Sequence, residues 1–278
     1  GVREWITQGR SAHNIGAPGG SPNVLSELTW RGLNSTITQV SAEAVFKRLV
    51  ADLRVGYGTL GSGTLLDQDR EGDNRTNKTA ETLSSVSDGS VITVSVDGGW
   101  RAFQWTYQDN PLHGGIDLLI GYQYWRERYV GNGLQDLLTG STVFTGVTAI
   151  TQTNTWHSFR LGARAIIPLH ARVAIKGSAF YIPVSRYENE EVHHLRTDLG
   201  QNPSFLTTAT GGNGVQLEGS VLIRVWERLM IEAGYAYWDI RSGNGSLQAF
   251  LSDGQVAVEP HNDEHTRRQV FFGITWTF

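Results

Sequence analysis

Two carboxylates separated by one residue are the clearest candidates for chemistry in this chain. Asp67 and Asp69 follow the run from Thr59 to Leu66, which leads out of an alternating segment. Successive side chains of an extended chain point to opposite faces, so both carboxylates point the same way. Two close carboxylates raise the pKa of one of them, and the pair can share a proton or polarise a water. A solvated acidic loop and a divalent-cation site are the alternatives for this spacing.

The element that must position this pair is a β-strand. Between positions 49 and 62, apolar and polar residues alternate, which predicts a strand with one apolar face. Its apolar residues are Ala51, Leu53, Val55 and Tyr57. We expect this strand to lead into a long loop, 63–90, that carries Asp67 and Asp69.

The same alternation predicts about ten long strands along the whole chain. We place them at 2–15, 24–46, 49–62, 91–108, 114–130, 147–167, 171–187, 213–226, 229–241 and 264–278. The connections between them alternate in length. The long ones are 16–23, 63–90, 131–146, 188–212 and 242–263, and the short ones are 47–48, 109–113, 168–170 and 227–228. Alternating long and short connections are typical of an up-and-down barrel, so residues 1–278 are interpreted as one barrel domain.

Charges on the inward faces of these strands favour a membrane barrel over a soluble sandwich. They are Arg54, Arg160, Arg164, Lys176, Glu218 and Arg224. A dry core does not tolerate such charges unpaired, whereas a wet or ion-paired barrel interior does. The last segment, from Val270 to Phe278, alternates large apolar residues and ends on an aromatic. The sequence therefore predicts an all-β, antiparallel transmembrane barrel of the outer membrane, with short periplasmic turns, long extracellular loops and both termini periplasmic.

Composition excludes several classes of function. The net charge is −4, so the chain has no basic footprint for nucleic acid. It contains no cysteine, which excludes disulfides and thiolate–metal sites. No spacing of residues indicates a cofactor or a metal ion, and neither is predicted.

Three short motifs resemble a known family. They are the run from Ser26 to Trp30, the run from Thr59 to Asp69 that ends in Asp-Gln-Asp, and Gly121 to Gln123. Together with ten long strands, these motifs are similar to the omptins, outer-membrane endoproteases of Gram-negative bacteria. The topology covers nearly the whole chain, and Asp-Gln-Asp is the most specific of the motifs.

The resemblance implies a catalytic arrangement. In omptins an Asp-x-Asp pair faces an Asp-x-His pair across the barrel mouth, and the His–acid pair is thought to activate a water that the Asp pair positions. The matching position here holds Glu191 and His193, with Glu in place of Asp. A carboxylate can hold an imidazole in its basic tautomer. Because Glu is one methylene longer, this departure bears directly on whether the chain cleaves peptides.

Asp263, Glu264 and His265 form a competing motif. They spell the family tripeptide more closely, but they open the last strand rather than the expected wall of the mouth. A surface ion pair, a metal site with His261, or chance are the alternatives. The remaining histidines, including His13, are interpreted as structural.

Three functions remain open at this point. The first is an omptin-type endopeptidase using Asp67, Asp69, Glu191 and His193, for which the resemblance implies dependence on lipopolysaccharide and a preference for basic peptides. The second is an inactive barrel with a structural, adhesive or partner-binding role at the cell surface. The third is a small pore, which inward ion pairs would plug. Outer-membrane lipid is a partner in every case, and a larger surface assembly is compatible with the second.

Overall fold

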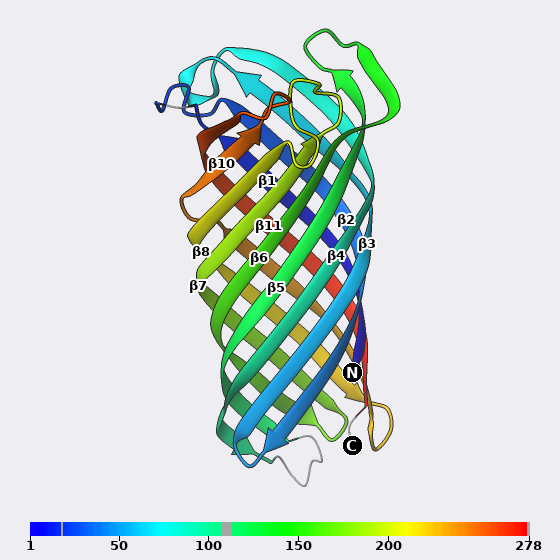
Figure 1. The fold of residues 1–278 in the computed structure, drawn as a ribbon. Helices are drawn as coiled ribbons and strands as arrows, with labels where there is room; N and C mark the ends of the chain where they lie inside the picture. Colours follow the sequence, from blue (N-terminus) through cyan, green and yellow to red (C-terminus); the bar gives the residue numbers. More distant parts are fainter. Residues whose placement is uncertain (18, 107–112, 277–278) are drawn as a thin grey trace.

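The computed structural model describes residues 1–17, 19–106 and 113–276, which form a tall β-barrel (Figure 1). The strands are β1 (Val2–Ile15), β2 (Ser26–Phe46), β3 (Leu49–Arg70), β4 (Lys78–Trp105), β5 (Gly114–Asp136), β6 (Thr142–His170), β7 (Val173–His193), β8 (Phe205–Arg224), β9 (Leu229–Arg241), β10 (Gly245–Phe250) and β11 (Val256–Trp276). A single 3₁₀ turn, η1 (Asp73–Arg75), is the helical element of this part of the chain. Among the described residues, no helix is long and apolar enough to cross a bilayer.

Every strand is antiparallel to its neighbours, and the sheet closes because β1 pairs with both β2 and β11. The closing register aligns Val2 with Ile274 and Ile15 with His261. β9 and β10 both pair with β8 and β11, so they occupy one position in the wall. The predicted ten-strand, up-and-down antiparallel barrel is confirmed.

The two ends of the barrel differ, and we call them the turn end and the hairpin end. At the turn end the connections are short, and the turn predicted at 47–48 is confirmed. The turns expected at 168–170 and 227–228 lie at 171–172 and 225–228. The turn expected at 109–113 lies mostly outside the described residues. At the hairpin end the long predicted loops are largely wrong. The connections there are 16–25, 71–77, 137–141, 194–204, 242–244 and 251–255, and the rest is strand.

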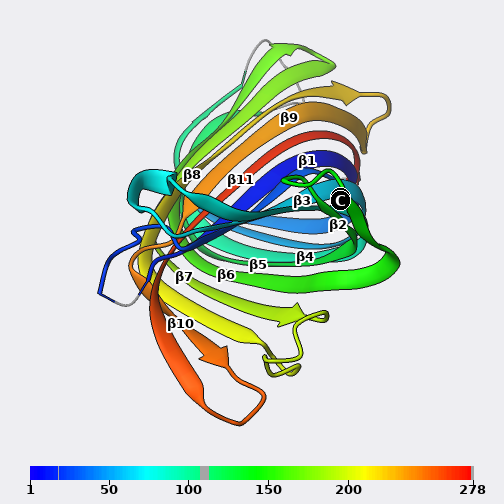
Figure 2. The same cartoon turned by 90° about the horizontal axis from the view of Figure 1, so that it is seen from above.

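The strands continue into these segments because polar residues pair there as well as apolar ones do. Asp67 pairs with Thr82 and Asp69 with Ala80, in segments where both faces are polar. Hydrophobic alternation, the signal used to predict strands, is absent there. Viewed from the hairpin end, β10 leans outward from the mouth together with the start of β11 (Figure 2).

An apolar belt surrounds the turn-end half of the outer surface. Its exposed side chains include Leu53, Tyr57, Leu118, Tyr122, Phe159, Ile167, Tyr181, Val184, Leu217 and Val221. The apolar stripe predicted on β3 lies on this face. On β3 the belt ends at Tyr57, and Asp67 lies roughly 25 Å further along the barrel axis. The hairpin end therefore stands clear of any bilayer that covers the belt.

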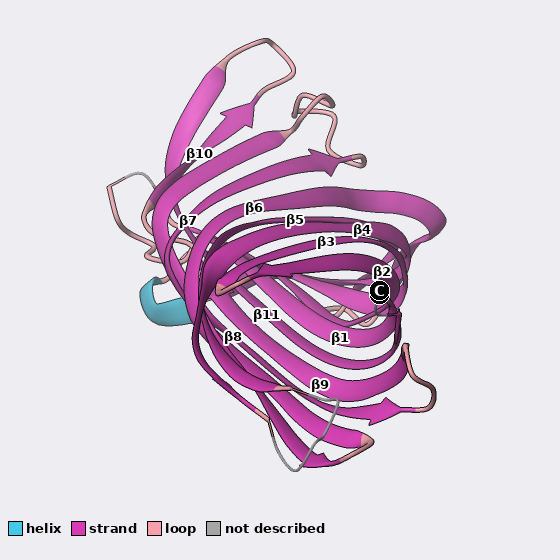
Figure 3. Ribbon diagram, turned by 90° about the horizontal axis from the view of Figure 1, so that it is seen from below, coloured by secondary structure: helices cyan, strands magenta, loops and turns pink. Residues whose placement is uncertain are grey.

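Inside the belt, the barrel is filled by an ion-paired layer. The pairs include Arg3–Glu218, Arg54–Asp52, Arg160–Asp97, Arg164–Asp117 and Lys176–Glu232. Seen from the turn end, the strands are arranged in a ring (Figure 3). The predicted inward charges are thus confirmed as paired residues, with Arg224 half-buried at the rim.

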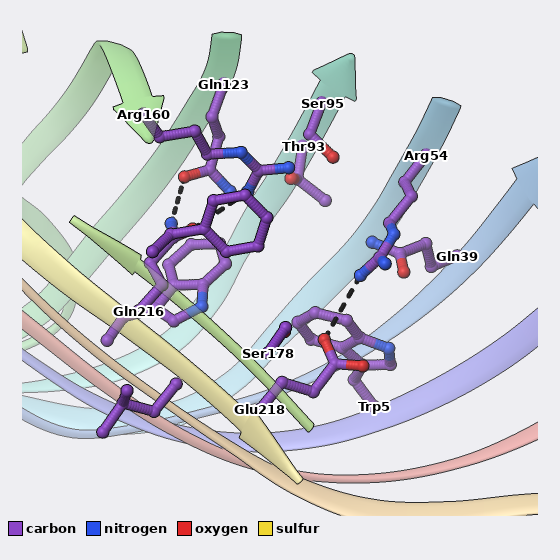
Figure 4. Close-up of a pocket in the computed structure, with 13 residues that line it drawn as sticks. Trp5, Gln39, Arg54, Thr93, Ser95, Gln123, Arg160, Ser178, Gln216 and Glu218 are labelled. Atoms are coloured by element: carbon purple, nitrogen blue, oxygen red, sulfur yellow. Dashed lines mark hydrogen bonds and ion pairs between the residues drawn. The ribbon is translucent and has the colours of Figure 1, made fainter. Parts of the chain in front are cut away.

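Aromatic residues close the interior above the ion pairs. The cluster comprises Trp5, Ile37, Val91, Trp125, Trp156, Ile182, Tyr187, Ala209, Ala236, Trp238 and Ile240. At its border, Gln216 bridges Gln123 and Arg160, and Arg54 reaches Glu218 from the opposite wall (Figure 4). The space left between these side chains is about 20 Å³, close to the size of one water.

Candidate functional site

The acid pair lies on the inner face of β3 because the strand changes phase below it. Leu60 and Leu65 are both buried in one interior cluster, although an uninterrupted strand would point them to opposite faces. The change coincides with shifts in the β2–β3 register around Gly32, whose φ is 57°. This β-bulge turns Asp67 and Asp69 towards the mouth instead of outward.

The second pair, Glu191 and His193, reaches the inner face of β7 in the same way. Lower on β7, Ile182 is buried, whereas higher up the buried position is Ser185. The β7–β8 register shifts between these two residues. Both predicted pairs therefore lie inside the hairpin end, on strands that three other strands separate.

Glu191 and His193 contact each other. Glu191 is fully buried, and its Oε2 lies 3.3 Å from Nε2 of His193, whose side chain is 12% exposed. Since the carboxylate accepts, the histidine Nε2–H donates, and Nδ1 of the neutral ring keeps its lone pair. A neutral imidazole with a free lone pair can act as a general base.

Two further residues complete the surroundings of Glu191, and sequence reasoning missed both. Asn189 Nδ2 donates to Glu191 Oε1 at 2.5 Å, and His13 Nε2, from β1, lies 3.7 Å from the same oxygen. Burial opposes ionisation of Glu191, but His13, His193 and Asn189 outweigh it and lower the pKa of Glu191 to about 2. The alternation Asn189, Glu191, His193 was a signal that could have identified Asn189.

The connection 194–204 braces the histidine. The backbone N–H of His193 donates to Ser204 Oγ at 2.9 Å, and Gln201 Nε2 donates to the carbonyl of His193 at 3.1 Å. The backbone N–H of Ser204 donates to the carbonyl of Glu191 at 2.7 Å. The edge of the Phe205 ring packs against His193 at a centroid distance of 4.9 Å. His193 is thus fixed in position from its backbone and its ring.

Asp67 connects the two pairs electrostatically. Its side chain is half-buried, and burial together with the charge of Asp69 raises the pKa of Asp67 to about 7. Glu191 also contributes to this rise in the pKa of Asp67, whereas His193 and Arg196 oppose it. The ionisation of Asp67 on β3 therefore depends on charged groups of β7 and of the connection that follows it.

The floor of the mouth is a sealed polar network. Gln152 accepts a hydrogen bond from Nε1 of Trp30 and donates to Asn154 Oδ1 at 2.9 Å. Tyr187 donates to the same Asn154 oxygen at 2.6 Å. The four side chains are at most 1% exposed, so this network is part of the packed interior.

The competing motif lies on β11, the strand that pairs with β1 beside His13. Its backbone belongs to β11, where Asp263 and His265 pair with His13 and Ser11 of β1, while its side chains lie outside the described residues. Among the described residues, no group of three or more His, Asp or Glu side chains is arranged to hold a metal ion.

Comparison with known proteins identifies the family. Residues 4–218 match the family described as Pom, Protochlamydia outer membrane protein. The chain belongs to this family. No curated protein matches the chain in a sequence search.

Solved structures of other outer-membrane proteins resemble this chain in fold. The outer membrane protease OmpT of Escherichia coli matches with a TM-score of 0.75 and 13% identity, covering 100% of this chain and 96% of OmpT. The transport unit of the autotransporter AIDA-I of Escherichia coli matches with a TM-score of 0.40 and 15% identity, covering 100% and 90% of the two chains. The translocator domain of NalP of Neisseria meningitidis has a TM-score of 0.34 at 13% identity, with coverages of 100% and 88%.

The Pom chain is therefore an outer-membrane β-barrel with the omptin fold, as its motifs indicated. At 13% identity the likeness to OmpT concerns the fold. What the mouth does must be argued from its own residues.

Proposed function

We propose that this Pom protein is an endopeptidase of the cell surface, with the hairpin end extracellular and both termini periplasmic. The observation that carries the proposal is that both pairs lie on the inner face of the hairpin end, Asp67 and Asp69 on β3 and Glu191 in contact with His193 on β7. OmpT, which shares the fold, is described as a protease.

In the proposed mechanism, each pair has one task. Glu191 orients His193 through Nε2, and the free Nδ1 removes a proton from a water held between the two walls. Asp67, with a pKa of about 7, is protonated in about half of the molecules at neutral pH, so it can donate to or accept from that water. Asp69 faces the same space and supplies the second oxygen ligand of the water.

Glu191 stands where the omptin motif has Asp, and in the proposal its surroundings hold the longer side chain in place. A misplacement near 1 Å can reduce a rate about 100-fold, so a longer side chain must be held firmly. Asn189, at 2.5 Å, and His193, at 3.3 Å, each hold one oxygen of the carboxylate. The additional methylene therefore leaves the acid within reach of the imidazole.

Charges at the rim support a basic peptide as substrate. Among the acidic residues near the hairpin end, Glu71 and Glu190 are exposed without an ion pair in the described structure. Glu81 pairs with Lys78, and Glu188 with Arg186. The remaining acidic rim still favours the approach of a cationic peptide.

Lipopolysaccharide is proposed as the lipid partner. Arg126, Arg128 and Arg186 are exposed on the outer wall, beyond Tyr122 and the end of the apolar belt. Cations at that height match the phosphates of a lipid headgroup. This contact would help to seat the barrel with its mouth above the membrane.

The test is cleavage of peptides with paired basic residues by the purified barrel refolded with lipopolysaccharide. We expect wild type to cleave, and the rate to fall about 10²- to 10⁴-fold in His193→Gln and in Asp67→Asn. The matched control is His194→Gln, because His194 is the exposed neighbour of His193. No cleavage by wild type, or equal cleavage by all variants, would overturn the proposal.

A second candidate, a non-catalytic barrel that binds a partner, has one observation in its favour. The β5–β6 hairpin exposes a row of apolar side chains beyond the belt. They are Leu137, Leu138, Val143, Phe144 and Val147. If the barrel binds a partner in this way, shortening the hairpin would abolish binding, whereas replacing Asp67, Asp69, Glu191 or His193 would not.

The filled interior does not favour a pore. Steady conductance in planar bilayers would show that the barrel conducts after all.

A further inference from the structure

We infer that His13, which the family motif does not include, is a positioning residue that holds Glu191 in the orientation His193 requires. The expected effect of His13 on cleavage rests on the proposed function, whereas its effect on the orientation of Glu191 does not. His13 comes from β1, on the side of the barrel opposite β7, and its side chain is fully buried.

The register places His13 between the two pairs. It pairs with Leu28 on β2, which in turn pairs with Asp67 on β3. From this row the ring extends across the mouth to lie 3.7 Å from Glu191. His13 is therefore the side chain through which the β1–β3 wall meets the β7 wall.

Asn189 lies beside both His13 and Glu191. Glu191 is an acceptor when ionised, so the Asn189 group 2.5 Å from it must be the amide NH₂. The same NH₂ lies 3.4 Å from His13 Nδ1, and His13 Nε2 faces Glu191 Oε1 at 3.7 Å, which is an ion-pair distance.

Glu191 consequently has its two oxygens assigned to different partners. Asn189 and His13 face Oε1, which leaves Oε2 for His193. Without His13, the carboxylate keeps the hydrogen bond from Asn189 and the contact with His193, but it loses the group that approaches it from β1 and is held less firmly about its last bond. His193 would then lose the fixed acceptor that keeps its proton on Nε2.

The experiment reads the tautomer of His193 directly, by long-range ¹H–¹⁵N NMR of histidine-labelled barrel in detergent micelles. Spectra are recorded about two pH units above the ordinary imidazole pKa, and His193→Gln assigns the signal. Wild type should show a single Nε2–H tautomer at His193. His13→Leu should show a mixture, whereas His13→Gln, which keeps a buried donor, should restore the wild-type signal.

Cleavage gives the second readout. Where wild type cleaves, His13→Leu should lower kcat about 10- to 100-fold with little change in KM, and His13→Gln should recover most of it. If wild type does not cleave, the proposed function fails but the tautomer measurement still decides the role of His13. An unchanged His193 tautomer in His13→Leu overturns the inference. Should that variant not fold, His13→Ala, which leaves room for water, is measured in its place.

Discussion

The lower and upper interiors of this barrel place charge in opposite ways. Within the apolar belt each acid has a cation: Asp97 has Arg160, and Asp117 is shared by Arg101 and Arg164. At the hairpin end, Asp67 instead lies beside Asp69, and no ion pair to either is found in the described structure. Paired buried charge fills and specifies an interior, whereas like charges held together cost stability. The difference agrees with a structural role for the lower layer and with the proposed catalytic role of the mouth.

The first prediction tests this division with the largest change. Arg164 is 1% exposed and contacts Glu43, Asp52 and Asp117, so Arg164→Met leaves buried carboxylates short of a cation. We expect the free energy of unfolding to fall by about 3 to 5 kcal/mol. Urea titration of the refolded barrel in detergent, followed by tryptophan fluorescence, measures it.

The matched control is Arg186→Met, which removes an Arg from an exposed pair with Glu188. An exposed ion pair contributes about 0 to 1 kcal/mol, so this variant should unfold almost as wild type does. Equal losses in the two variants would show that the lower layer is not specially dependent on its charges, and the contrast between the two interiors would fail.

The sequence predicted the lower half of the molecule better than the upper half. Apolar alternation on β3 identified both the strand and its outward face, as the exposure of Leu53 and Tyr57 confirms. It failed above Gly61, where Ser, Thr and charged residues occupy both faces of a strand that has no lipid contact. The pairing of Asp67 with Thr82 depends on a partner strand, and local pattern does not report it.

The sequence named the residues of the proposed site but did not predict on which face of the barrel wall their side chains lie. The spacing of Glu191 and His193 places them on one face, yet which face depends on the register shift between Ile182 and Ser185. His13 could not be found from local spacing, because it lies far from Glu191 in the chain and reaches it only through the closure of the barrel. Glu191 and its partners thus show that tertiary pairing, not motif, assembles the site.

The second prediction concerns the cost of placing Asp67 beside Asp69. The pKa of Asp67 rises from 3.8 to about 7 in the folded protein, so the folded state binds the extra proton between these values. The free energy of unfolding must then fall as pH rises through this window and level off above it. Asp67→Asn removes the effect. Relative to wild type, its stability should rise by about 1 to 3 kcal/mol between about pH 4 and pH 8.

Urea midpoints of wild type and Asp67→Asn, measured across that pH range, test the prediction. Glu190→Gln is the control, since Glu190 is an exposed acid on the outer face of β7. As a surface substitution away from the acid pair, it should change the urea midpoint little at any of these pH values. If the stability difference between Asp67→Asn and wild type also does not change with pH, Asp67 behaves as an ordinary surface acid. The contrast with the ion-paired acids inside the apolar belt would then fail.

The third prediction is smaller and isolates the interaction within the acid pair. Asp69 raises the pKa of Asp67, second only to burial, so Asp69→Asn should shift the titration of Asp67 to lower pH. Near neutral pH this relief should stabilise the barrel by less than about 1 kcal/mol, because the mouth is open to solvent. Once Asp67 is already Asn, replacing Asp69 should add nothing, so the double-mutant cycle should give a coupling energy near the effect of Asp69→Asn alone. Strict additivity would mean that the carboxylates do not interact, and they would then be two separate rim acids rather than one water-binding pair.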